Sequence, residues 1–490
     1  MNTPLRKVGM AMLVMIVLLL ANATYIQVVK ADDYRTDPRN ARVLYDEFAR
    51  RRGQIVSQAN GEVLAKVAPS NDKYKFIRTY TDGPMYAPVT GYYSINYGAG
   101  GLERAEDDVL NGSDPRLFVR RLSDMVTGRD PSGGNVRLTI DPAVQKAAYD
   151  LMSSKGYTGA VVAMEPKTGR ILAMVSTPSY DPNLLASHIS KTQLDAWNAN
   201  TKQGGPNPML NRAISETYPP GSTQKLVTAA AALEDGKGPD TPVSNAPNTK
   251  LPGTNTTLEN YGGAPCPGTT FKDALAHSCN VPFAEFAGQL GADKLKKTAA
   301  NFGIGQNDLT VPMKVAPSTL GPLDSQGALY QSGIGQRDVR LTPLQDCLLA
   351  ATVANNGMAM RPQLVQSILD TDLSTIEDYT PTELTGTAAL SSSNAAILRD
   401  MMIASESFTK GNGKDPALKI ASKTGTAEHG TDSKNTAPHA WYTAFAPSDN
   451  PQIAVAVIVE NGGNRGLAAT GGTVAAEIGR AAIAAKLGGG

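Results

Sequence analysis

A Pro-Pro-Gly sequence directly before an apolar, alanine-rich run is the feature that most constrains how this chain folds. Pro219, Pro220 and Gly221 end whatever structure precedes them, and such residues commonly stand next to a helix start. We therefore expect a helix to begin at or near Ser222, with Lys225 one turn later on the same face. The start of that helix would also present backbone N–H groups to an anion.

A serine three residues before a lysine at a helix start is typical of nucleophilic catalysis. The hydroxyl is a weak nucleophile and needs a nearby base, and a desolvated lysine can be that base. The same spacing recurs as Ser70/Lys73 and Ser407/Lys410, in polar stretches that we interpret as solvated. Position relative to later motifs distinguishes the Ser222 copy.

Two motifs follow Ser222 along the chain. They are Ser278-Cys279-Asn280 and Lys423-Thr424-Gly425, the latter followed by Thr426. A serine–lysine pair, then Ser-x-Asn, then Lys-Thr-Gly is the signature of penicillin-binding proteins and serine β-lactamases. Strand-like segments at 439–447 and 453–460 follow the last motif, so we expect Lys423 on a substrate-lining edge strand.

A second Lys-Thr-Gly, at Lys167, fails the order test because it precedes the serine. It stands between two apolar runs, residues 160–165 and 170–175. This arrangement predicts a hairpin turn in which Gly169 supplies a positive φ.

The chain resembles class B penicillin-binding proteins over nearly its whole length. The matching stretches are residues 138–145, 161–175, 332–336, 341–345 and 354–357, and, in a non-catalytic pedestal, 52–55, 61–65 and 91–103. The pedestal is most similar to that of actinobacterial, A-type members. The resemblance implies an α+β fold, a penicillin-binding/serine β-lactamase-like transpeptidase domain whose antiparallel sheet is flanked by helices. Sequence pattern alone predicts only a mixed α/β chain.

We predict three regions, because 490 residues are too many for a single core. They are a cytoplasmic tip and transmembrane anchor (1–30), a pedestal of dimerisation type (31–133) and the transpeptidase domain (134–490). The linker is expected at Asp130–Asn135. Residues 239–270, rich in Pro, Gly, Asn and Thr, predict a loop insertion.

The anchor is predicted at Val8–Val29, a largely apolar stretch of 22 residues that spans about 33 Å as a helix. Arg6 and Lys7 precede it and Asp32-Asp33 follow, which predicts a cytoplasmic N-terminus and an extracytoplasmic catalytic domain on the cell membrane. The alternative is a signal peptide cleaved after Ala21-Asn22-Ala23. The apolar residues that continue past this site favour an uncleaved anchor.

Charge and cysteine content limit the other classes of function. The chain has 46 basic and 45 acidic residues, net +1, which does not suggest a nucleic-acid partner. Cys266 and Cys279 could form a disulfide beside the Ser-x-Asn motif or remain two buried thiols, and Cys347 is expected to be a buried thiol. We predict no metal site and no cofactor.

The motifs predict the following chemistry. Ser222 attacks a carbonyl carbon, and Lys225 is its base once burial and the second cation, Lys423, destabilise its ammonium. Ser278 relays the proton to the leaving amine, and Asn280 holds the amide on the acyl side. Backbone N–H groups of Ser222 and Thr426 would form the oxyanion hole. Residues 423–426, including Thr424 and Gly425, would bind the substrate, with Lys423, Thr424 and Thr426 holding its terminal carboxylate.

The resemblance implies a D,D-transpeptidase acting on peptidoglycan stem peptides that end in D-alanyl-D-alanine, with β-lactams as acylating inhibitors and divisome or wall-synthesis proteins as partners. A carboxypeptidase or β-lactamase would share the catalytic residues, and a class A β-lactamase would need an extra glutamate, for which Glu377 and Glu383 stand in the right order. A β-lactam sensor, an inactive scaffold and a bifunctional synthase fit less well. His439 and Trp441 are expected to shape the wall of the site, and no histidine suits a Ser-His-Asp triad.

Overall fold

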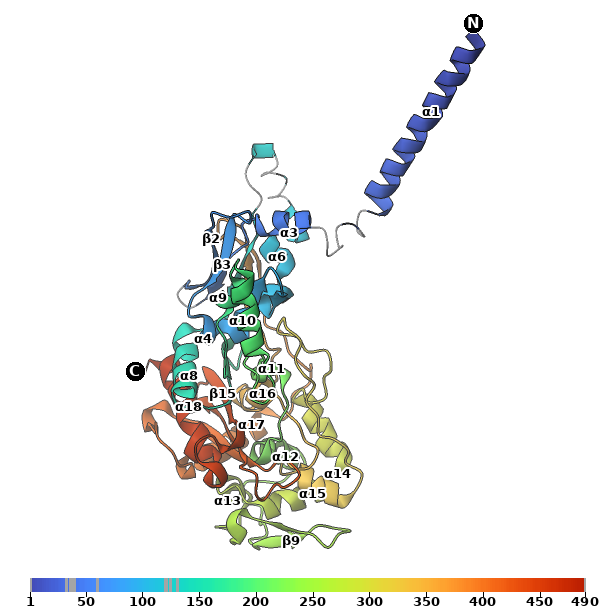
Figure 1. Ribbon diagram of the computed structural model, residues 1–490. Coiled ribbons are helices and arrows are strands. Elements are labelled where there is room, and N and C mark those ends of the chain that lie inside the picture. Colours follow the sequence, from blue (N-terminus) through green and yellow to red (C-terminus); the bar gives the residue numbers. More distant parts are fainter. Residues whose placement is uncertain are drawn as a thin grey trace.

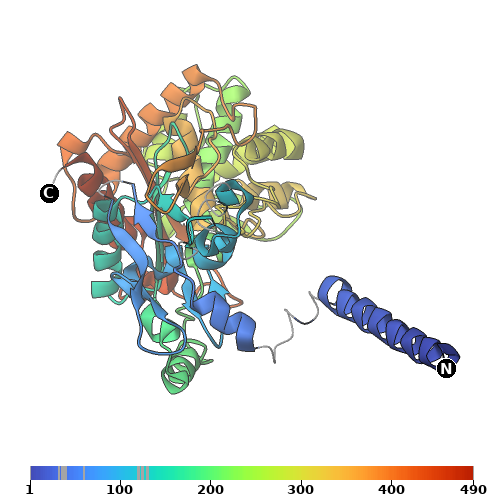
Figure 2. The same ribbon diagram turned by 90° about the horizontal axis from the view of Figure 1, so that it is seen from above.

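The computed structural model describes residues 2–30, 34, 41–58, 61–118, 122, 126–128 and 132–488. Asp32-Asp33 and the Asp130–Pro131 part of the predicted linker lie outside these ranges. Within them, Figures 1 and 2 show a long N-terminal helix that stands apart from a two-part body. The pedestal, drawn largely in blue, is the part nearer this helix, and the larger catalytic part lies beyond it (Figure 1).

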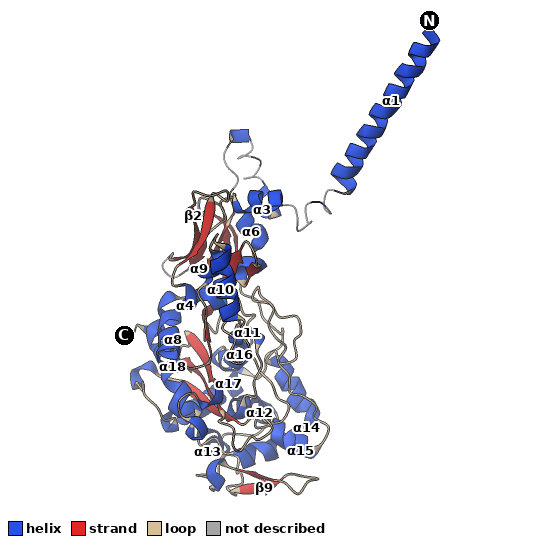
Figure 3. Cartoon of the chain, viewed as in Figure 1, coloured by secondary structure: helices blue, strands red, loops and turns tan. Residues whose placement is uncertain are grey.

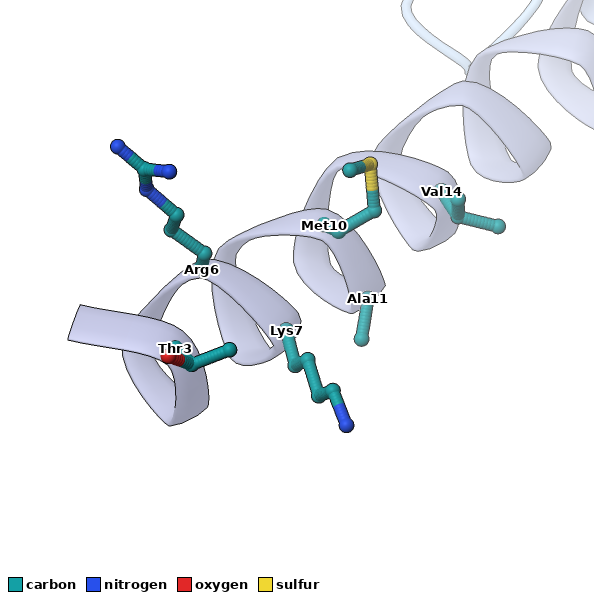
Figure 4. A pocket seen from close by; sticks show the side chains of 6 residues that line it. All are labelled: Thr3, Arg6, Lys7, Met10, Ala11 and Val14. Atoms are coloured by element: carbon teal, nitrogen blue, oxygen red, sulfur yellow. The ribbon is translucent and has the colours of Figure 1, made fainter. Parts of the chain in front are cut away.

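The N-terminal helix, α1 (Asn2–Thr24), continues as a π-helical turn, η1 (Tyr25–Val29). Among the described residues, Thr3–Val29 is the helical stretch long and apolar enough to cross a membrane, by length and composition. Figure 4 shows its first turns, where Arg6 and Lys7 point away from each other and the apolar side chains begin beyond them. The hollow that these side chains line contains none of the predicted catalytic residues.

The pedestal is built on a six-stranded mixed sheet that also includes strands from later in the chain. Its order is β12 (Thr375–Asp378), β11 (Val365–Leu369), β6 (Asn135–Leu138), β1 (Ile55–Ser57), β2 (Val63–Pro69) and β3 (Phe76–Tyr80). β1 and β6 are parallel and the other pairs are antiparallel. The sheet thus extends across the predicted boundary near residue 133.

Smaller elements complete the pedestal and the segment that follows it. They are α3 (Ala41–Phe48), α4 (Gly83–Thr90), β4 (Tyr92–Ser94), β5 (Gly98–Gly100), α5 (Leu102–Ala105), α6 (Asp107–Asn111), α9 (Pro182–Ala186) and α10 (Ser190–Asn200). Glu103 is fully buried among them, and its carboxylate accepts hydrogen bonds from Arg52 Nε and Arg78 Nε, both at 2.6 Å. This paired charge ties the pedestal helices to its sheet, because a buried carboxylate needs such partners.

The catalytic part contains a five-stranded antiparallel sheet. Its order is β13 (Ala421–Ala427), β14 (His439–Ala446), β15 (Ile453–Val459), β7 (Gly159–Met164) and β8 (Ile171–Thr177). The antiparallel sheet implied by the family resemblance is therefore confirmed. The turn between β7 and β8 contains Lys167, with Gly169 at φ +78° as expected.

Helices cover both faces of this sheet (Figure 3). In β15, Ala454, Ala456 and Ile458 pack into one core, whereas Val455 and Val457 pack into the other. The first core includes α12 (Lys225–Glu234), α14 (Asn280–Asn301) and α16 (Pro343–Ala354), and the second includes α8 (Pro142–Ser154) and α18 (Ala476–Leu487). Burial on both faces explains why these strands are continuously apolar instead of alternating.

The remaining elements surround the first core. They are α11 (Arg212–Ser215), α13 (Phe271–Ala276), α15 (Gln326–Ser332), α17 (Ser392–Phe408) and a hairpin of β9 (Asn248–Lys250) with β10 (Thr257–Glu259). The predicted loop insertion at 239–270 thus carries a small hairpin of its own.

Candidate active site

The predicted nucleophile lies on a short turn that leads directly into a buried helix. Ser222 belongs to a 3-10 turn, η3 (Gly221–Gln224), and α12 begins at Lys225. Ser222 is partly exposed, whereas Lys225 is fully buried. Gly221 has φ +55°, a left-handed conformation that favours glycine. The helix start expected from the Pro-Pro-Gly sequence is therefore present.

The Ser-x-Asn motif lies at the junction between two helices. Ser278 follows α13 with φ +59°, and Asn280 is the first residue of α14. Between them, Cys279 is joined to Cys266 in a disulfide, with the two Cα atoms 5.6 Å apart. Of the two alternatives left open by the sequence, the structure contains the disulfide, and Cys347 is a buried free thiol.

The Lys-Thr-Gly motif lies on β13, at the edge of the five-stranded sheet. Lys423 is fully buried and its chain neighbour Thr424 is partly exposed, as is Thr426. Within the described part of the chain, one side of β13 has no neighbouring strand, which is the arrangement expected for a strand that receives an extended peptide.

Two lysines connect the three motifs. Lys225 Nζ donates to the Ser278 carbonyl oxygen at 2.8 Å and to Asn280 Oδ1 at 2.7 Å. Lys423 Nζ donates to Ser278 Oγ at 2.7 Å and to its own neighbour, the Thr424 carbonyl, at 2.8 Å. Directly bonded residues as far apart as 145 positions thus lie in one cluster, beside the turn that carries Ser222.

Burial lowers the pKa of both lysine side chains. It lowers the pKa of Lys423 to about 7. The pKa of Lys225 is lowered well below its usual 10.5, mainly by burial and further by the charge of Lys423. A lysine that is neutral near physiological pH can accept a proton from a hydroxyl. Ser222 accepts no hydrogen bond from Lys225 among the described contacts, and such bonds often form only when substrate is bound.

Glycines allow β13 to press against the nucleophile turn. A Cβ atom at Gly425 would lie 2.7 Å from the Pro220 carbonyl oxygen, and one at Gly221 would lie 2.7 Å from the Thr426 carbonyl oxygen. Real Cβ contacts are not that short, so each position needs glycine. The backbone of the turn and the backbone of the edge strand therefore lie side by side at Ser222.

Trp441 and His439 support the site from behind. Trp441 is fully buried, and its Nε1 donates to the Pro219 carbonyl oxygen at 3.0 Å. His439 is also buried and stacks on His429, with ring centroids 3.8 Å apart. Burial lowers the pKa of His439 to about 3. Both side chains are buried, so they contribute little to the exposed surface of the site, and Trp441 instead contacts the segment just before the nucleophile turn.

Three supporting residues were not predicted. Gly335 packs on the nucleophile turn, and its carbonyl accepts the Gly221 N–H at 3.0 Å. Asp346 is fully buried in α16, and burial raises the pKa of its carboxyl to about 7 while the Thr223 hydroxyl opposes this. Asn260 contacts the backbone of Asn280. Asp346 could have been predicted, because a charged residue within an apolar helix stands out in the sequence. The residues around Asn260 gave no such indication.

The two glutamates considered for a β-lactamase lie elsewhere. Glu377 belongs to β12 in the six-stranded sheet, where it pairs with Arg116. Glu383 is exposed and its backbone bridges to Met360. Neither carboxylate is therefore placed to activate water at Ser222.

Two stretches of the chain match models of known protein families. Residues 159–484 match the penicillin binding protein transpeptidase domain, and residues 52–136 match the penicillin binding protein A dimerisation domain. The chain is 55% identical to the peptidoglycan D,D-transpeptidase PbpA of Mycolicibacterium smegmatis and 50% identical to that of Mycobacterium tuberculosis, over 99% of each chain in both cases.

Solved structures give the same result. The ceftriaxone acyl-enzyme complex of penicillin-binding protein A from M. tuberculosis superimposes with a TM-score of 0.87 at 49% identity, covering 90% of this chain and 100% of that one. Its penicillin G acyl-enzyme complex gives 0.85 at 49% identity, covering 89% and 100%. The present chain therefore belongs to the penicillin-binding protein transpeptidase family.

Proposed function

We propose that this chain is a serine D,D-transpeptidase that crosslinks peptidoglycan stem peptides through an acyl-enzyme on Ser222, and that β-lactams acylate the same serine. The relatives named peptidoglycan D,D-transpeptidase and the β-lactam acyl-enzymes of a protein 49% identical support this function. The observation that carries it is the buried cluster in which Lys225 and Lys423 both bind Ser278.

Acylation needs a proton acceptor beside the nucleophile. Ser222 Oγ attacks the carbonyl carbon of the penultimate D-alanine, and Lys225 Nζ takes the hydroxyl proton. The oxyanion is held by the backbone N–H groups of Ser222 and Thr426, each such donor typically contributing roughly 10²–10³ in rate. The close approach of β13 to the turn supports this pairing.

The carbon–nitrogen bond then breaks, and the terminal D-alanine leaves as an amine. The Ser278 hydroxyl, which accepts a hydrogen bond from Lys423 Nζ, gives its proton to that amine and takes in exchange the one that Lys225 received. Lys225 itself is held next to Ser278 by its contact with the Ser278 carbonyl oxygen. Asn280 holds the amide on the acyl side of the substrate. An amine of a second stem peptide then attacks the ester and returns the proton by the reverse route, which releases Ser222.

The terminal carboxylate of the donor peptide would bind beside β13. Lys423 supplies positive charge, and the partly exposed Thr424 and Thr426 supply hydroxyls on the free edge of β13, with Gly425 between them. Serial N–H and hydroxyl donors beside a cation suit a carboxylate. The carboxylate of a β-lactam would occupy the same position.

We further propose that α1 anchors the protein in the cell membrane, with the N-terminus in the cytoplasm and the catalytic part outside. Arg6 and Lys7 at its start support this orientation. Residues 31–133 would serve as the pedestal and 134–490 as the catalytic domain, which lends β6, β11 and β12 to the pedestal's sheet. Partners in the cell-division or wall-synthesis machinery would then bind along the membrane.

The transpeptidase and hydrolase functions differ in the fate of the acyl group. Full-length chain in detergent is incubated with donor pentapeptide and nascent glycan strands, and dimeric crosslinks are separated from free tetrapeptide. Crosslinked dimers that disappear in the Ser222→Ala variant are the expected result. Tetrapeptide and D-alanine without dimers would instead assign a carboxypeptidase.

A further inference from the structure

The helix that begins with Asn280 has no cap of its own. Four backbone N–H groups at the start of a helix lack partners within it, and a side chain at the preceding position usually accepts one or two of them. Here that position is Cys279, which makes no side-chain cap and is committed to its disulfide with Cys266. Pro282, the third helical residue, has no N–H. The donors left among the first three residues are those of Asn280 and Val281.

Asn260 accepts both of these hydrogen bonds from a position 20 residues earlier in the chain. Its Oδ1 receives the Asn280 N–H at 2.7 Å and the Val281 N–H at 3.0 Å. Its Nδ2 donates to the carbonyl oxygens of Ala246 and Ala264 at 2.9 and 3.2 Å. The residue is only 6% exposed. A primary amide is the short side chain that can accept two bonds and donate two at once.

The segment that contains Asn260 also binds the side-chain amide of Asn280. Asn280 Nδ2 donates to the carbonyl oxygen of Glu259 at 2.7 Å, one residue before Asn260. Asn280 Oδ1 is thereby turned toward Lys225, whose Nζ lies 2.7 Å away. A continuous chain of hydrogen bonds thus runs from the 239–270 insertion, through Asn280, to the lysine that would take the Ser222 proton.

We propose that Asn260 is a positioning residue for acylation: it caps α14 from outside the helix and so fixes the Asn280 amide against Lys225. This inference rests on the proposed function, because the step that Asn260 would assist is the acylation of Ser222. Asn260 itself is assigned no contact with substrate. Without the cap, the buried Val281 N–H and the partly buried Asn280 N–H lose their acceptor, the first turn of α14 loosens, and the Asn280 amide no longer has one orientation. Displacements of about 1 Å in such groups can cost a hundredfold in rate.

The test measures acylation of the full-length chain in detergent by a fluorescent penicillin, over enough concentrations to separate the binding constant from the first-order acylation rate. Asn260→Ala should lower that rate by roughly ten- to a hundredfold, with binding changed by less than about threefold. Asn135→Ala is the matched control. Asn135 is also buried, and it too accepts a backbone N–H, from Gln54 at 2.7 Å, and donates to a carbonyl, that of Asp370 at 2.6 Å. Because it lies in the six-stranded sheet, its loss should affect thermal stability and leave acylation near the wild-type rate.

A double-mutant cycle then separates positioning from general destabilisation. In an Asn280→Ala background, Asn260→Ala should slow acylation by less than about threefold further, because the group that it positions is gone. Undiminished slowing in that background would overturn the proposal, and so would wild-type acylation by a folded Asn260→Ala variant.

Asn260→Asp covers the case in which Asn260→Ala does not fold. The introduced carboxylate cannot donate to the two carbonyls, but it still accepts from the two N–H groups. Because the cap is kept, acylation should stay closer to the wild-type rate than in a folded variant that lacks the acceptor. An Asn260→Asp protein that folds and acylates no faster than Asn280→Ala would count against the capping role. Failure of the wild-type chain to be acylated at all would be different, because it would remove the proposed function itself.

Discussion

Two lysines of like charge share one serine at the centre of this site. Lys225 Nζ binds the Ser278 carbonyl and Lys423 Nζ binds the Ser278 hydroxyl. Both are fully buried, so a proton on one disfavours a proton on the other. Because the pKa of Lys225 is lowered by burial and by Lys423, we infer that the proton shared by the pair lies on Lys423. This leaves Lys225 free to act as a base.

The pKa of Lys423 leads to a pH prediction. Its pKa of about 7 means that the protonated fraction falls as the pH rises through neutrality. The second-order rate constant for penicillin acylation should therefore fall on the alkaline side of about pH 7, since the cation that binds the carboxylate is lost. Lys423→Arg, which stays charged, should move this decline to higher pH. Lys167→Arg, in the other Lys-Thr-Gly, is the control, and an unchanged profile in Lys423→Arg would contradict the assignment.

The nucleophile can be identified by comparing the three serines that precede a lysine by three positions. Ser222→Ala should abolish covalent labelling by a fluorescent penicillin, because among the residues that the structure describes no other hydroxyl lies on a helix start beside two buried lysines. Ser70→Ala and Ser407→Ala should label normally. Ser407 is exposed and bonded to the Ala404 carbonyl, and Lys73 bonds to Tyr45 instead of a serine. Labelling that survives in Ser222→Ala would exclude Ser222.

At the scale of elements, the nucleophile turn is held between β13 on one side and the Gly335 segment on the other. A Cβ atom at Gly335 would lie 2.1 Å from the Gly221 carbonyl oxygen. Backbone atoms of this kind cannot move aside as the tip of a side chain can. The position of Ser222 therefore depends on glycines in three separate segments, at 221, 335 and 425.

Gly335→Ala should damage both stability and acylation. Its φ of +73° alone costs roughly 1–3 kcal/mol in a residue with a side chain, and the contact with Gly221 adds to this. We expect the melting temperature to fall by several degrees and acylation to slow by at least about tenfold. Gly386→Ala is the matched control, because Gly386 also has a positive φ, +62°, but open space around its Cβ position. Equal acylation rates in the two variants would contradict a role for Gly335 in placing the nucleophile.

The sequence predicted those parts of the site in which the functional groups belong to one short motif. The Ser222 turn, the Ser-x-Asn junction and the Lys423 strand were each predicted, and the structure brings all three together. Asn260 was missed because its partners lie 20 and 21 residues away, and an asparagine in a Pro- and Gly-rich loop resembles any turn residue. The antiparallel sheet came from family resemblance, since strands buried on both faces carry no alternation from which periodicity could identify them.

At the scale of the whole molecule, the fate of the acyl-enzyme distinguishes a synthase from a hydrolase. Glu377 is held in the six-stranded sheet by Arg116, and Glu383 is exposed. With neither able to activate water at Ser222, a penicillin adduct should persist for many minutes to hours. Intact-mass measurement over time checks this, and rapid return to the unmodified mass with steady penicillin hydrolysis would indicate a β-lactamase.

The six-stranded sheet also limits where genes of this family can recombine and still encode a folded protein. One of its two central strands, β6, pairs with β1 on one side and with β11 on the other, through Val136 opposite Ile55 and Ile368. A genetic crossover near residue 134 would join β1, β2 and β3 of one parent to β6, β11 and β12 of another. Viable hybrids should therefore inherit residues 365–378 from the same parent as residues 52–138, although some 230 codons separate them. Mosaic genes of this family would then show linked ancestry at two distant segments.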